Sequence, residues 1–92
     1  MRDLTTIEKM TKTAVLEAIA ICQPSAARDA GNPIEMQWRG RWLLAIDLCG
    51  AGHPVTLACY RGQTLISAAI NHRYGLPTPM PIKSMLYPSE AA

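Results

Sequence analysis

The stretch that decides the predicted fold is IEMQWRGRWLLAIDL, residues 34–48. Its first half, residues 34–39, alternates apolar and polar side chains. A period of two is typical of a half-buried β-strand, whose successive side chains point to opposite faces. Gly40 interrupts the pattern and predicts a tight turn. The stretch therefore predicts a β-hairpin whose second strand covers residues 42–48.

A third strand is predicted at residues 55–60, after a turn at residues 49–53 that contains two glycines. Val55, Leu57 and Cys59 alternate with less apolar neighbours and extend the apolar face of the hairpin. The three segments together predict an antiparallel meander.

Helices are predicted on both sides of this meander. Thr5 followed by Glu8 has the spacing of a capping box, which predicts a helix at residues 6–22. Apolar residues at helical spacing predict a second helix at residues 63–74, and Gly75 is the residue type expected just beyond a helix end.

The predicted fold class is therefore α+β, in two layers, with the order αβββα and both helices on the apolar face of the sheet. The 92 residues are enough for one domain, with a folded core at residues 1–76. Residues 77–92 contain alternating prolines and predict an extended, proline-rich C-terminal strap.

Composition narrows the class of protein. Hydrophobic residues make up 49% and charged residues 17% of the chain, which is typical of a globular domain. A net charge of +2 does not indicate a nucleic-acid-binding surface. Three cysteines at irregular spacing favour reduced thiols and a cytoplasmic location. Glu17 lies inside the most apolar N-terminal run, and no run reaches the roughly 18 apolar residues of a membrane span.

The predicted hairpin tip, residues 38–42, is the first candidate binding site. Trp and Arg are enriched at binding hot spots, and the tip would present Trp38, Arg39, Arg41 and Trp42 together. An alternative interpretation places both indoles at the end of the core and leaves two solvated arginines.

The outward face of the predicted sheet is the second candidate. It carries Leu43 and Tyr60 among polar residues, and Arg61 follows at its edge. A small apolar centre with a polar rim suits a protein partner, or a homodimer formed through this face or through the tail.

Two other classes of function are alternatives. A nucleic-acid-binding domain would use Arg39, Arg41, Arg61 and Arg73, with indoles stacking on bases. A thiol or zinc enzyme would use Cys49 and His53, but their spacing fits no usual zinc motif. We therefore predict no catalytic residue, metal or cofactor.

The predicted element order resembles that of double-stranded-RNA-binding domains, although residues 62–64, Gly-Gln-Thr, take the place of their lysine-rich helix start. The same order and size also resemble small phage-encoded inhibitors, including some anti-CRISPR proteins, and partner domains of toxin-antitoxin pairs. This resemblance implies a non-enzymatic protein-binding module from a phage or mobile element that occupies a surface of a larger host complex.

Overall fold

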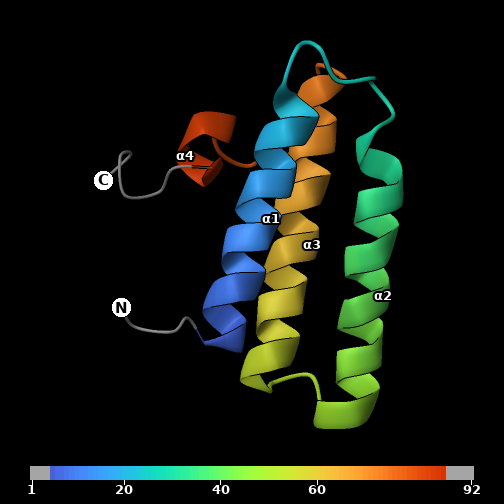
Figure 1. The fold of residues 1–92 in the computed structure, drawn as a ribbon, viewed down its shortest axis with the longest axis vertical. Helices are drawn as coiled ribbons and strands as arrows, with labels where there is room; N and C mark the ends of the chain where they lie inside the picture. The colour runs from blue at the N-terminus through green and yellow to red at the C-terminus, as the bar shows by residue number, and fades with distance from the viewer. Residues whose placement is uncertain (1–4, 87–92) are drawn as a thin grey trace.

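The structure is a computed structural model and describes residues 5–86. The helices of this part of the chain are α1 (Thr6–Cys22), α2 (Gly31–Cys49), α3 (Pro54–Arg73) and α4 (Ile82–Leu86). Helix α3 is the central element, because it packs along both α1 and α2, whereas α1 and α2 touch each other at few points (Figure 1). The short α4 packs against α1 and α3.

The predicted α+β fold is wrong. Residues 5–86 contain helices and no strand, so this part of the chain has neither the αβββα order nor the two-layer packing of helices on a meander. Residues 34–39 and 42–48, predicted as a hairpin, belong to the single helix α2. The resemblance to RNA-binding domains and to phage inhibitors depended on the αβββα order and loses that support.

The true period of α2 is helical. Glu35, Trp38, Trp42 and Ala45 are spaced by three or four residues and face the interior, as expected for one side of an α-helix. Ile34 and Trp38 are four positions apart, a spacing that puts two side chains on the same side of either a strand or a helix. The alternation at residues 34–39 therefore does not distinguish the two structures. Most of residues 35–45 are Glu, Met, Gln, Arg, Leu or Ala, which favour helix over strand.

The strand predicted at residues 55–60 and the helix predicted at residues 63–74 form one continuous helix, α3. The turn before it was correctly located but joins two helices. His53 is the N-cap residue, and its Nδ1 accepts a hydrogen bond from the Val55 backbone N–H at 3.1 Å. Pro54 occupies the first turn, where its missing N–H costs no hydrogen bond.

Two other expectations are confirmed. Helix α1 covers residues 6–22 as predicted, and the Glu8 backbone N–H donates a hydrogen bond to the Thr5 hydroxyl at 3.1 Å. Helix α3 ends at Arg73, one residue before the predicted end, and Gly75 takes the left-handed conformation with φ 75°. Both were predictable because capping depends on local sequence.

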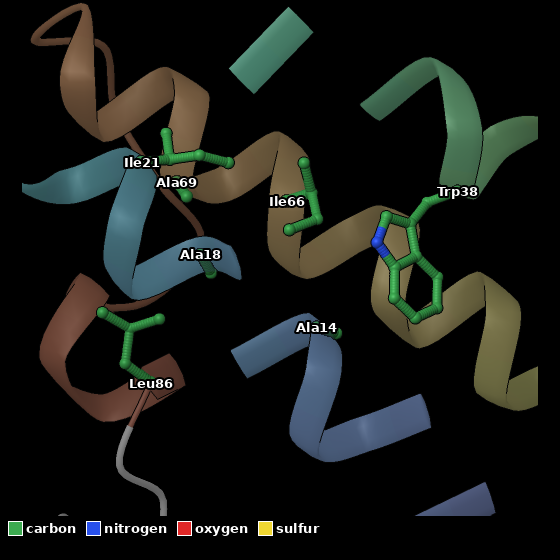
Figure 2. Close-up of a cluster of buried hydrophobic side chains, with 7 residues drawn as sticks. All are labelled: Ala14, Ala18, Ile21, Trp38, Ile66, Ala69 and Leu86. Carbon is green, nitrogen blue, oxygen red and sulfur yellow. The ribbon is translucent and has the colours of Figure 1, made fainter. Parts of the chain in front are cut away.

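The core is small and is built mainly from alanine, isoleucine and one tryptophan. Figure 2 shows residues of all four helices of the described chain meeting here; the buried cluster is Ala14, Ala18, Ile21, Trp38, Ile66, Ala69 and Leu86. The alanines allow α1 and α3 to approach closely, and the Trp38 side chain fills the remaining space between α2 and α3.

Trp38 depends on two partners from other helices. Its ring lies over Gly62 of α3 so closely that a Cβ at position 62 would overlap the ring. Its Nε1 donates a hydrogen bond to Glu17 Oε1 of α1 at 3.0 Å. The side chain is 1% exposed, so Trp38 fixes the separation of the helices from inside the core.

A polar network joins α2 to α3 beside this core. The buried Glu35 carboxylate accepts hydrogen bonds from Arg39 Nη2 at 2.6 and 2.8 Å and from Gln63 Nε2 at 3.0 Å. Gln63 Nε2 also lies 3.0 Å from Ser67 Oγ. The hydrogen bond from Gln63, followed by the bond and charge of Arg39, holds the pKa of Glu35 below its ordinary value, against the opposing effect of burial.

The loop between α1 and α2 is fastened by Arg73. Its Nη2 donates hydrogen bonds to the backbone oxygens of Pro24 at 3.1 Å and Ala26 at 2.7 Å. These carbonyls follow the end of α1 and have no helix to pair with, so Arg73 satisfies them from the last turn of α3.

Arg73→Ala is expected to lower the free energy of unfolding by about 2 kcal/mol, because two hydrogen bonds to a charged donor are lost. Arg73→Lys should retain only part of this stability, because a single ammonium matches the two carbonyls less well. Urea unfolding followed by circular dichroism measures both. The exposed Arg61 gives the control: Arg61→Ala should stay within about 0.5 kcal/mol of wild type. Equal stability of all four proteins would contradict this role.

The C-terminal segment packs on its own domain, but it is not extended throughout. Residues 77–81 lie outside any helix, and α4 then places Leu86 in the core cluster. The remainder of the predicted strap, residues 87–92, lies outside the described residues.

Among the described residues, none of the helices combines the length and the hydropathy needed to cross a membrane.

Candidate interaction surfaces

Residues 38–42 do not form a hairpin tip. They wind around the middle of α2 and point in different directions, because successive helical residues are separated by about 100°. Trp38 is in the core, Trp42 is half-buried, and Arg39 and Arg41 are exposed. For Trp38, the alternative interpretation of a core indole was the correct one.

Arg41 and Trp42 of this segment each make a contact with an aromatic ring. The Arg41 guanidinium lies 5.1 Å from the centroid of the Trp38 ring, within the range of a cation–π interaction. The Trp42 and Tyr60 rings are 5.1 Å apart and inclined at 52°. The structure thus joins Trp42 and Tyr60, which were predicted in two separate sites, while the sheet face that would have held Leu43 with Tyr60 does not exist.

The four arginines considered for nucleic-acid binding are not presented together. Arg39 is bound to Glu35, and Arg73 is bound to the loop after α1. Arg41 lies over the Trp38 ring on α2, and Arg61 belongs to α3. For Arg39 or Arg73 to bind a phosphate through these nitrogens, the side chain would have to leave its present partners.

Cys49 and His53 lie at the two ends of the turn that joins α2 to α3. Cys49 is exposed at the end of α2, and the Nδ1 of His53 is used as a helix cap. Burial raises the pKa of the Cys59 thiol, which opposes thiolate formation there. Within residues 5–86, no three His, Cys, Asp or Glu side chains are grouped so that they could hold a metal ion.

A groove with a volume of about 420 Å³ lies between α1, α3 and the C-terminal segment. It is open to solvent along one side, and its surface is almost entirely apolar. We call it the α1–α3–α4 groove, and the residues that carry the argument are Val15, Tyr60, Thr64, Leu65, Met80 and Met85.

The surface of this groove is more apolar than the residue types in its lining would suggest. Two of its residues are threonines, but each hydroxyl donates to the backbone of its own helix. Thr11 bonds to the Ile7 oxygen at 3.0 Å, and Thr64 bonds to the Tyr60 oxygen at 2.9 Å. The groove therefore presents few polar groups that an apolar ligand would have to desolvate.

The lining of the groove includes an aromatic and a positively charged side chain. Tyr60 is half-exposed and its ring contacts the ring of Trp42, and the exposed Arg61 supplies a positive charge. Met80 and Met85 are flexible and can adapt to the shape of a bound group. Of these groove residues, sequence reasoning had selected Tyr60 and Arg61 and had missed Val15, Leu65 and the methionines.

Comparison of the chain with protein families, curated proteins and solved structures finds no match. Its function has to be argued from its own residues.

Proposed function

We propose that this chain is a non-enzymatic protein-binding module whose binding site is the α1–α3–α4 groove. The observation that carries the proposal is the groove itself: an open, almost wholly apolar hollow of about 420 Å³ with an aromatic and a cationic residue at its rim. A volume of this order lies in the range of ligand pockets, roughly 300–1,000 Å³.

The favoured occupant is an apolar segment of a protein. An open groove suits side chains presented by a partner's backbone, as when the apolar side of an amphipathic helix lies in a groove. Tyr60 is a residue type enriched at binding hot spots, and its contact with Trp42 reduces the entropy lost on binding. Arg61 favours an acidic residue beside the apolar ones in the partner.

Covering a surface of a larger complex, as a small inhibitor does, is one form that this binding can take. That version of the proposal no longer has support from the αβββα order. It depends only on the groove, so the same experiment tests it.

Capture by the full-length tagged chain, followed by identification of bound proteins, tests the proposal. Met80→Glu places a charge in the groove, and we expect it to reduce recovery of the partner at least about tenfold. Tyr60→Ala should also weaken recovery. Leu16→Glu is the matched control, because Leu16 on α1 has nearly the same exposure, 56% against 54% for Met80, and does not line the groove.

Wild-type binding that Leu16→Glu retains and Met80→Glu loses supports the proposal, provided that circular dichroism shows all variants to be folded. A partner recovered equally by both charged variants would exclude the groove. Failure of the wild-type chain to recover any protein would count against the protein-binding function.

A further inference from the structure

Two methionines line the α1–α3–α4 groove. Met80 lies in the connection before α4 and is 54% exposed, and Met85 is a half-buried residue of α4. Neither belongs to the buried core cluster or packs against it, whereas Met10 of α1 does pack against that cluster. A chemical change at Met80 or Met85 would therefore alter the surface of the groove and leave the core intact.

A methionine thioether is apolar, and a mild oxidant converts it into a polar group. Hydrogen peroxide transfers one oxygen atom to the sulfur, so a sulfur–oxygen bond forms and the O–O bond of the peroxide breaks. The sulfur is oxidised by two electrons to a sulfoxide, and the peroxide is reduced to water. More than half of Met80 is exposed, so the oxidant reaches this side chain from solvent.

The groove offers few donors to a sulfoxide oxygen. The hydroxyls of Thr11 and Thr64 are bonded to backbone oxygens of their own helices, at 3.0 and 2.9 Å. In the free protein, water would solvate the sulfoxide, because the groove is open along one side. A bound apolar segment removes that water without replacing its hydrogen bonds, so the sulfoxide makes binding weaker.

We propose that Met80 is an oxidation site that switches off binding in the α1–α3–α4 groove. The thioether keeps the lining apolar and allows an apolar segment to bind. The sulfoxide opposes binding until a methionine sulfoxide reductase restores the thioether. The inference rests on the proposed function, because it regulates the same site. Met85 is less accessible and is expected to oxidise more slowly.

Met36 provides a comparison within the same chain. It lies on α2, is 68% exposed and does not line the groove. Its sulfoxide would stay in water whether or not a ligand occupies the groove, so its oxidation should not change binding there. The effect of an oxidised methionine therefore depends on its place in the fold, and Met36 separates that effect from oxidation in general.

Binding of anilinonaphthalene sulfonate to the full-length chain tests the inference. The rings of this dye suit the apolar lining, and its sulfonate suits Arg61. At a peroxide exposure that oxidises Met80 but not Met85, as measured by mass spectrometry of peptides, wild type should bind the dye about tenfold more weakly. Methionine sulfoxide reductases should restore the binding, which separates this effect from oxidation of cysteine.

Three variants test the position, each compared with its own unoxidised form. Met80→Leu lacks the thioether, so peroxide should leave its dye binding unchanged. Met36→Leu is the matched control and should lose binding on oxidation as wild type does. Met80→Gln carries a permanent polar group and, without peroxide, should bind the dye as weakly as oxidised wild type. Circular dichroism should show the same helix content for all of these proteins.

Oxidised wild type that binds the dye as tightly as the reduced protein would overturn the inference. So would a Met80→Leu variant that loses as much binding on oxidation as wild type. Partner capture separates the two proposals. A partner recovered equally by the reduced and the oxidised chain supports the proposed function and contradicts the switch. Dye binding that is lost on oxidation, in a chain whose reduced form recovers no partner, supports the oxidation site and counts against the protein-binding function.

Discussion

Gly62→Val is expected to lower the free energy of unfolding by about 3 kcal/mol. A side chain at position 62 would occupy the space of the Trp38 ring, and that ring cannot move away because it is buried between three helices and bonded to Glu17. The helix itself would lose little from the change, since valine favours helix more than glycine does. Chemical denaturation followed by Trp fluorescence measures the effect.

Gly40→Ala is the matched control and should have the opposite sign. Both glycines lie in the interior of a helix, but only Gly62 contacts another side chain. At position 40 the change should raise the free energy of unfolding by about 0.5–1 kcal/mol through helix propensity alone. Equal effects at the two positions would contradict the packing argument.

The Trp38→Leu background separates packing from propensity. Leucine is smaller than tryptophan, so Gly62→Ala in this background should become neutral or stabilising, whereas in wild type it should destabilise. A Gly62→Ala effect that is the same in both backgrounds would show that Trp38 is not the reason for glycine at this position.

These two glycines also explain why the fold was not predicted from the sequence. Gly40 was interpreted as a tight turn, and residues 61–62 were left as a break between the predicted third strand and the second helix. Gly62 is instead required by a tryptophan 24 positions earlier in the chain, a tertiary contact that no local pattern reveals. With breaks placed at both glycines and at residues 49–53, the segments that remained, 42–48 and 55–60, had the length of strands.

Local signals were reliable where the structure is locally determined. The Thr5 cap, the end of α1 and the left-handed Gly75 all follow from residues within one turn of the helix end. A signal for α2 was also present, because residues 35–45 favour helix by propensity and contain no β-branched residue. The strand prediction followed the alternation of apolar residues at 34–39 and not this helix propensity.

The candidate groove could not be predicted from the sequence for a different reason. Its walls come from residues 11–15, 60–65 and 80–85, which are brought together only by the packing of α1 and α4 on α3. Tyr60 and Arg61 were selected because of their residue types, and the sheet face proposed for Tyr60 was wrong. The apolar lining depends on hydroxyls that are bonded to their own helices, which sequence alone does not specify.

The buried Glu35 should make the stability of the protein depend on pH in the acidic range. Its pKa is lowered in the folded state by the bonds from Gln63 and Arg39, so folding favours the ionised carboxylate. A lowered folded-state pKa gives stability that is complete above the ordinary value of 4.5 and is lost as pH falls through the lower, folded-state pKa. Urea unfolding at a series of pH values from neutral to about 2.5 measures this dependence.

Glu35→Gln separates this carboxylate from the rest of the acid titration. At neutral pH the variant should be less stable than wild type by about 1–2 kcal/mol, because the amide accepts weaker hydrogen bonds than the carboxylate. The loss is no larger than this because Arg39 is exposed and solvent partly screens its charge. Below the folded-state pKa the wild-type carboxyl is also neutral, so the difference should become small. Gln63→Ala should move the loss of stability to higher pH, because it removes the largest cause of the lowered pKa. A difference between wild type and Glu35→Gln that stays constant over the whole pH range would show that the charge of Glu35 does not stabilise the α2–α3 interface, and that the side chain contributes only through its shape.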